Sequence, residues 1–137
     1  MTNLKIANKN YEIKYGYEST LKADIITKII NTSQSKSIDS MFLLTSELLL
    51  AGLQKNHKDE FGYNYDTGEG KEEQMEKIYE MLEQYCDEDE KHNLMELNDK
   101  LQGELLSNRF LSKTLDEMNE RVQKAIEEQE KAQNQNN

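Results

Sequence analysis

The residues whose chemistry could support catalysis are few in this sequence, and they lie far apart. His57 lies in a polar stretch, His92 follows an acidic run, and Cys86 ends an apolar helical stripe. Neither histidine has a recognised catalytic spacing to the cysteine, which predicts two exposed histidines without a role and a small core cysteine. No ligand spacing supports a zinc site built from these side chains and nearby carboxylates.

Motifs for phosphate, nucleophile or calcium chemistry give no better candidate. The sequence has no glycine-rich phosphate loop and no serine in an elbow motif. The stretch 64–69 resembles the start of an EF-hand loop, but the twelfth position counted from Asn64 is Met75 rather than an acidic ligand. We therefore expect no catalytic residue, no metal site and no cofactor, and a protein that is not an enzyme.

Charge is distributed unevenly along the chain. Residues 1–65 contain eight lysines and seven acidic residues, whereas residues 66–137 contain nine basic and twenty acidic residues, which gives the net charge of −10. Such acidity repels nucleic-acid phosphates and anionic lipids, so neither a nucleic acid nor a membrane is an expected partner. Solvated helix faces account for most of this charge, and a surface that binds a basic partner is the alternative.

The cysteine count and the first residues predict a cytoplasmic protein. Cys86 is the only cysteine, which excludes an internal disulfide and fits a reducing compartment. The opening residues MTNLKIANKN lack the apolar core of a signal peptide. The length of 137 residues suits one domain with a substantial core, and the absence of proline leaves few obligatory helix breaks.

The element that must position everything else is the stretch 38–53, IDSMFLLTSELLLAGL. It is apolar around most of a helical circumference, which predicts a core helix that other elements cover, and it is too short and too polar in the middle to span a membrane. Before it, residues 3–15 alternate between apolar and polar on both sides of a turn at 7–10, which predicts a β-hairpin. A helix from Ser19 or Thr20 to about Asn31 follows.

The second half of the chain is predicted to be a loop over 52–70 and helical from Lys71 onwards. The predicted fold class is therefore mainly α, with a small N-terminal β-hairpin packed on a bundle of about four to five helices. We expect a mostly helical domain over 1–110, a C-terminal amphipathic helix over 111–128 and a disordered tail over 129–137, because the tail has no apolar content.

One apolar seam in the C-terminal helix is the first candidate for a partner-binding surface. Its residues step by four, three and four positions and are flanked by Glu and Lys: Leu111, Leu115, Met118 and Val122. This pattern is typical of a short heptad seam of about two repeats. The seam could bind a partner or a second copy, and the alternative is packing on the core of its own chain.

The hairpin and the helix after it also carry a family resemblance. The stretch 10–17, NYEIKYGY, followed by Thr20-Leu21-Lys22, resembles the opening of tail assembly chaperones from siphophages that infect Gram-positive bacteria. An apolar second helix and an acidic, helical C-terminal half also fit that family. The resemblance covers mainly residues 3–55.

The resemblance implies a non-enzymatic protein of phage tail morphogenesis. Its expected partners are the tape-measure protein, a long amphipathic helix whose apolar stripe needs covering, and the tail-tube (major tail) protein, whose subunits it helps to recruit. The implied location is the host cytoplasm, with absence from the mature virion. A longer product made by frameshifting often accompanies such proteins.

Two other classes of function stay open on the sequence. One is an acidic helical inhibitor that acts as a decoy for a basic DNA-binding protein, which requires carboxylates on one face. The other is a structural helical oligomer held together by the C-terminal seam.

Overall fold

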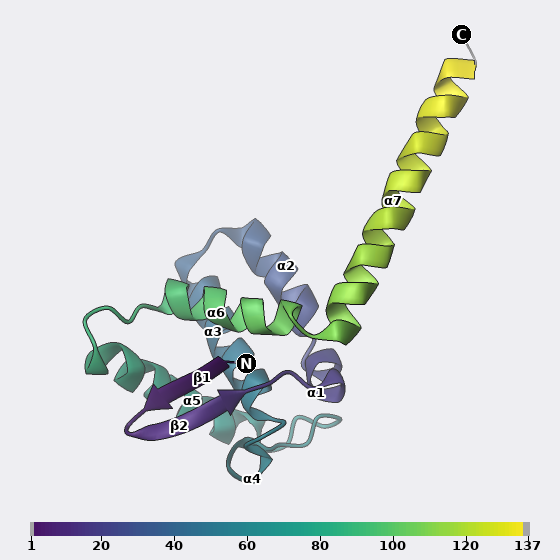
Figure 1. Cartoon of the computed structure of the whole chain (residues 1–137). Coiled ribbons are helices and arrows are strands. Elements are labelled where there is room, and N and C mark those ends of the chain that lie inside the picture. Colours follow the sequence, from purple (N-terminus) through teal and green to yellow (C-terminus); the bar gives the residue numbers. More distant parts are fainter. Residues whose placement is uncertain (1, 136–137) are drawn as a thin grey trace. The chain divides into compact units, whose positions relative to one another are not determined.

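The computed structural model describes residues 2–135 and is mainly α-helical (Figure 1). Two antiparallel strands form a hairpin, β1 (Thr2–Ile6) and β2 (Lys9–Ile13). Within the described residues seven helices follow: α1 (Tyr17–Lys22), α2 (Ile25–Ser35), α3 (Ile38–Leu53), α4 (Lys58–Phe61), α5 (Lys71–Glu88), α6 (Leu94–Leu106) and α7 (Arg109–Gln135). The predicted fold class, a small β-hairpin on a helical bundle, is confirmed, and α1 and α4 are short additional helices.

The chain divides into two compact units, Met1–Leu105 and Leu106–Asn137. The predicted boundary between residues 110 and 111 falls inside α7 instead. This helix also continues through residues 129–135, where the sequence predicts a disordered tail. Most residues of this segment are alanine, glutamine, glutamate or lysine, which favour a helix even without an apolar face. Neither glycine nor proline interrupts the segment. The last two residues of the predicted tail lie outside the described part of the chain.

The hairpin turns on two residues, Ala7 and Asn8, which both have left-handed φ angles, 53° and 63°. Two-residue turns of this kind match the twist of the strands that they join. The predicted turn was longer, but Lys9 already belongs to β2. The Ala7 N–H donates a hydrogen bond of 2.6 Å to the Glu88 carboxylate at the end of α5, which holds the turn in place.

One face of the hairpin packs on helices of the same unit: β2 contacts α3, and β1 contacts α5. The buried side chains of this face are Leu4, Ile6, Tyr11 and Ile13. After β2, the Lys14 N–H donates to the Gly52 carbonyl at 3.0 Å, and the buried Tyr15 hydroxyl donates to the Leu48 carbonyl at 2.8 Å. The ribbon is therefore attached to α3 by backbone and side-chain hydrogen bonds as well as by apolar contact.

Tyr15 makes the stability of the protein sensitive to alkaline pH. Burial raises the pKa of its hydroxyl well above the ordinary value, and the Glu104 carboxylate raises that pKa further. The unfolded chain releases this proton from about pH 10 upwards while the folded chain retains it, so the stabilising contribution is complete below pH 10 and declines above it.

Tyr15→Phe should therefore lower the free energy of unfolding by about 1 kcal/mol at neutral pH, because a buried hydrogen bond is lost. The difference between wild type and variant should close to about zero near pH 11, where ionisation in the unfolded state favours unfolding of the wild type only. Urea denaturation at about pH 7, 9 and 11 measures this difference. A difference that stays constant over this range would contradict the prediction.

The core of the first unit is built around the C-terminal part of α3. Its fully buried leucines are Leu48, Leu49, Leu50 and Leu53. Ile78 on α5 and Leu97 and Leu101 on α6 are also completely buried. Ser37 caps the start of α3, where its hydroxyl accepts a hydrogen bond from the Ser40 N–H.

The helix predicted from Ser19 or Thr20 to Asn31 is two helices. α1 begins earlier, at Tyr17, and the chain breaks at Asp24, whose φ of 55° is left-handed. The break buries Ile25 completely and leaves Leu21 exposed. Local periodicity does not reveal such a break, because the packing of Ile25 decides it.

Candidate functional site

The two histidines hold the fold together rather than standing free on the surface. The His57 Nε2 accepts a hydrogen bond of 3.1 Å from the Glu12 N–H, which joins the hairpin to the start of α4. The His92 ring stacks on the Tyr85 ring with centroids 3.9 Å apart, and its Nδ1 lies 2.6 Å from the Tyr85 carbonyl. The prediction that both histidines are exposed is therefore wrong, since each is partly buried, and the absence of a functional role stays a prediction.

Cys86 is free and only half-buried, so it is not the core residue that the sequence predicts. Burial raises the pKa of its thiol, and the neighbouring Asp87 raises it further. Because the thiolate is the nucleophilic form, both effects disfavour reactivity at this position. Among residues 2–135 there is also no group of three or more histidine, cysteine or acidic side chains that could hold a metal ion.

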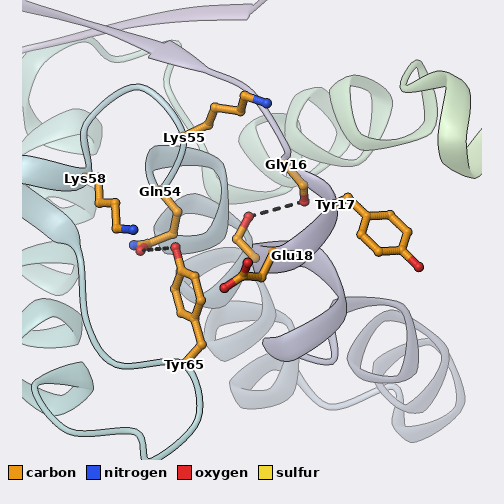
Figure 2. Close-up of a pocket in the computed structure, with 8 residues that line it drawn as sticks. Gly16, Tyr17, Glu18, Gln54, Lys55, Lys58 and Tyr65 are labelled. Atoms are coloured by element: carbon orange, nitrogen blue, oxygen red, sulfur yellow. Dashed lines mark hydrogen bonds between the residues drawn. The ribbon is translucent and has the colours of Figure 1, made fainter.

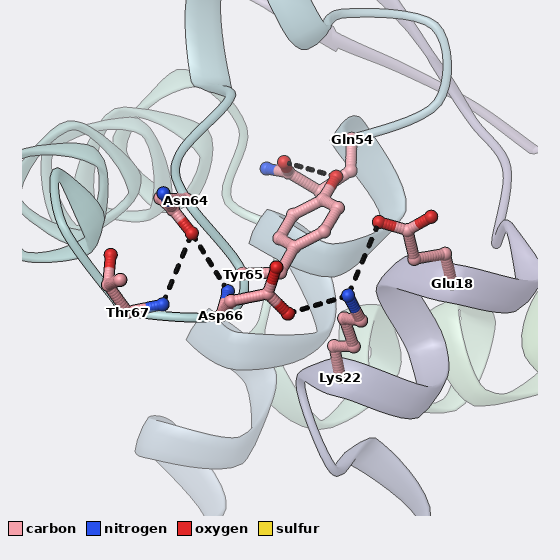
Figure 3. Close-up of polar contacts among 7 residues, drawn as sticks. All are labelled: Glu18, Lys22, Gln54, Asn64, Tyr65, Asp66 and Thr67. Carbon is pink, nitrogen blue, oxygen red and sulfur yellow. Dashed lines mark hydrogen bonds and ion pairs between the residues drawn. The ribbon is translucent and has the colours of Figure 1, made fainter.

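The loop that resembles the start of a calcium loop uses its polar groups internally (Figure 3). The Asn64 Oδ1 accepts hydrogen bonds from the N–H groups of Asp66 and Thr67, at 2.9 and 3.1 Å. The Asp66 carboxylate pairs with Lys22 on α1 at 2.6 Å, and Lys22 also lies 3.8 Å from Glu18. These contacts attach the loop to α1.

A polar cleft of about 470 Å³ lies beside this loop (Figure 2). It is lined by Gly16, Tyr17, Glu18, Ser19, Gln54, Lys55, Lys58 and Tyr65. The buried Gln54 amide donates to the carbonyls of Leu50 and Phe61 at 3.2 and 2.7 Å, and its oxygen accepts from the Tyr65 hydroxyl at 3.0 Å. The most buried polar group of the cleft is thus satisfied by the protein itself, and it fastens α3 to the following loop.

The N-terminal part of α3 is the principal surface that sequence reasoning missed. The prediction of a helix covered along its length holds only from Leu44 onwards, because Ile38, Phe42 and Leu43 are exposed. The apolar pattern continues through both halves of the helix, so it contains no signal that separates them. The exposed half flanks a groove of about 380 Å³ between α2, α3 and α6, whose lining includes Ile29, Ile38, Met41 and Met95.

A second surface is the acidic side of α5. Its exposed carboxylates recur every three or four residues and therefore share one face of the helix: Glu72, Glu76, Glu80, Glu83 and Asp87. None of these five has an ion-pair partner within residues 2–135. We call this row of carboxylates the α5 ridge.

The predicted seam on α7 is exposed mainly in its second half. Leu111 is 9% exposed and Leu115 is half-buried, whereas Met118 and Val122 are 56% and 55% exposed. Sequence reasoning missed Ile126, which is 43% exposed and lies four residues beyond Val122, at helical spacing that extends the seam by one turn. The large apolar side chains of Met118, Val122 and Ile126 on α7 are thus exposed to solvent in the described structure.

Comparison of the chain with protein-family models, with curated proteins and with solved structures gave no match. Within the described residues, every helix is too short or too polar to cross a membrane.

Proposed function

We propose that this protein is a phage tail assembly chaperone that binds the tape-measure protein and helps to recruit tail-tube subunits in the host cytoplasm. The observation that carries the proposal is the exposed apolar seam of α7, formed by Met118, Val122 and Ile126. A long amphipathic helix is the form in which a tape-measure protein would present its own apolar stripe. Pairing of two such helices along their apolar faces covers both.

The residues that carry the family resemblance divide between the core and the surface. Tyr11, Ile13 and Tyr15 of the stretch 10–17 are all buried, where they pack the hairpin on α3. Tyr17 and Leu21, which also belong to the resemblance, are 65% and 63% exposed, so part of the same segment is open to a partner. The seam on α7 and the exposed half of α3 are further apolar surfaces for that purpose.

Co-expression with the tape-measure protein tests the proposal. The wild-type chain should keep the tape-measure protein soluble and co-purify with it, whereas Met118→Asp/Val122→Asp should lose most of both effects. Two carboxylates in an apolar helix interface cost several kcal/mol, enough to weaken binding by about a hundredfold or more. Both positions are more than half exposed, so the double variant should retain the wild-type circular dichroism and melting temperature.

The matched control is Gln123→Asp/Asn134→Asp, which adds the same charge to exposed positions of α7 off the face of the seam. This variant should solubilise the tape-measure protein as well as the wild type does. Failure of the wild type itself to solubilise the tape-measure protein would refute the chaperone proposal. Equal loss in both double variants would show that net charge, rather than the seam, governs the result.

The α5 ridge favours one alternative, an acidic decoy for a basic DNA-binding protein. Five unpaired carboxylates along one helix face, within the described residues, are the arrangement that this function requires. The decoy would bind through charge alone, so its affinity should fall steeply between low and high salt, whereas an apolar seam is much less sensitive to salt.

A further inference from the structure

A cleft between α3 and α5 combines an apolar centre with an acidic border. Its volume is about 560 Å³, and it is lined by Leu43, Glu47, Gly68, Lys71, Glu72, Met75, Glu76 and Tyr79. Leu43 and Tyr79 are 52% and 49% exposed, while Met75 is buried. The cleft lies within the first unit, where α3 and α5 pack against each other. We call it the α3–α5 cleft.

The lysine in this cleft is already occupied by the protein. Lys71 lies 3.1 Å from the carboxylate of Glu47, which is mostly buried and also lies 3.3 Å from Lys28 on α2. Two lysines thus compensate the buried Glu47, and this triad fixes α2, α3 and the start of α5 together. The exposed carboxylates of Glu72 and Glu76 have no ion-pair partner in the described part of the chain.

We propose that the α3–α5 cleft is a docking site for an amphipathic helix of a partner protein that carries lysine or arginine beside its apolar stripe. A leucine-sized side chain of the partner would contact Leu43, Met75 and Tyr79. Basic residues one turn on either side of that side chain would reach Glu72 and Glu76. Charge complementarity selects this occupant, because an apolar cleft alone would accept a helix of any charge.

A second copy of this chain is a poor occupant for the same reason. The whole chain has a net charge of −10, so two copies repel each other. Around Val122 and Ile126, residues 117–128 of α7 contain four acidic and two basic residues, so this helix would meet the carboxylates of Glu72 and Glu76 with a net like charge. The inference concerns a surface separate from α7, and it does not depend on the proposed chaperone function.

A synthetic probe tests the α3–α5 cleft without knowledge of the natural partner. The probe is a fluorescein-labelled peptide of about 18 residues, or five helical turns, made of leucine and lysine at helical spacing. Two comparison peptides are one with glutamate in place of lysine and one with the same leucines and lysines in scrambled order. Fluorescence anisotropy with the full-length protein at about 0.15 M salt, where surface charges are partly screened, gives the affinities.

Two double variants and one control separate the two components of the cleft. Leu43→Ser/Tyr79→Ser removes the exposed apolar groups, and Glu72→Gln/Glu76→Gln removes the charge at the border. Glu83→Gln/Asp87→Asn removes the same charge from the same helix beyond the cleft lining. All six side chains are exposed, so melting temperatures should stay close to that of the wild type.

We expect saturable binding of the leucine–lysine peptide that weakens about tenfold or more in each cleft variant and only about twofold in the control. The glutamate and scrambled peptides should bind at least about tenfold more weakly than the probe. The α7 variant Met118→Asp/Val122→Asp should bind the probe normally, so failure of the chaperone proposal would leave this result intact.

Three outcomes would overturn the inference. Absence of saturable binding to the wild type would show that the cleft is not a docking site. Equal weakening in the cleft-charge variant and the control would assign binding to the whole α5 ridge, as an acidic decoy requires. Unchanged binding in Leu43→Ser/Tyr79→Ser would show that the apolar centre takes no part.

Discussion

Leu49→Ala should lower the free energy of unfolding by about 2–5 kcal/mol, because it removes a completely buried side chain and leaves a cavity in the core. α3 contacts α2, α5 and β2, so the cavity has neighbours on several sides that cannot all move to fill it. The total stability of a domain is about 5–15 kcal/mol, so this single change removes a large part of it. The change in the free energy of unfolding is measured by urea denaturation, with the helical circular dichroism signal at 222 nm as the readout.

The matched control is Leu43→Ala on the same helix. Leu43 is about half exposed, so the same substitution should cost less than about 0.5 kcal/mol. The pair tests the division of α3 into a covered and an uncovered part at Leu44. Similar losses at both positions would mean that Leu43 is covered in solution, which would remove the basis for the α3–α5 cleft as an open surface.

Gly52→Ala should destabilise the protein by about 1–3 kcal/mol through overpacking where the hairpin meets α3. A Cβ atom on Gly52 would lie 2.7 Å from Ile13 Cγ2 and 3.2 Å from the Tyr15 ring. Both side chains are completely or almost completely buried, so neither can move away without disturbing the core. The Lys14 N–H bond to the Gly52 carbonyl should lengthen as the strand is displaced.

Gly103→Ala on α6 is the comparison for this prediction. A Cβ atom there has no neighbour within 4 Å, so the substitution should stabilise α6 by about 0.5–1 kcal/mol through reduced backbone entropy. In thermal unfolding experiments, Gly52→Ala should lower the melting temperature and Gly103→Ala should raise it. A stabilising effect of Gly52→Ala would contradict the close approach of β2 to α3.

Much of the fold could be predicted because its signals are local. The alternation of apolar residues identified the hairpin, and the apolar stretch 38–53 coincides with α3. Helix α5 follows the expected apolar stripe only in part: Met75, Ile78, Leu82 and Tyr85 are buried, whereas Tyr79 is 49% exposed and Cys86 is half-buried. In each case the spacing of apolar residues within one element determines which face is buried, and no knowledge of its neighbours is required.

The differences arise where neighbouring elements decide the outcome. The break at Asp24, the short helix α4 and the exposure of Leu43 all depend on which elements reach α3 and where they end. The predicted disorder of residues 129–137 rested on missing apolar contacts, whereas helix propensity alone carries α7 to Gln135. Amino-acid composition does not indicate whether apolar contacts or helix propensity decides the structure of this segment.

The candidate surfaces were predictable only in part. The seam from Leu111 to Val122 follows from heptad spacing, and its use by a partner stays a prediction. The α3–α5 cleft could not be found in the sequence, because Leu43 and Tyr79 lie far apart in the chain and each looked like an ordinary core residue. Only the packing of α3 against α5 brings them together beside Glu72 and Glu76.

The attachment of the hairpin has a consequence for how the chain folds as it is synthesised. The Glu12 N–H bonds to His57, the Lys14 N–H to Gly52, and the Ala7 N–H to Glu88, all of which are translated later. A two-stranded ribbon is only marginally stable alone, so the hairpin can pack stably only after α5 has left the ribosome. Closure of this long loop should limit the folding rate, and the residues made before α3 should be among the last to dock.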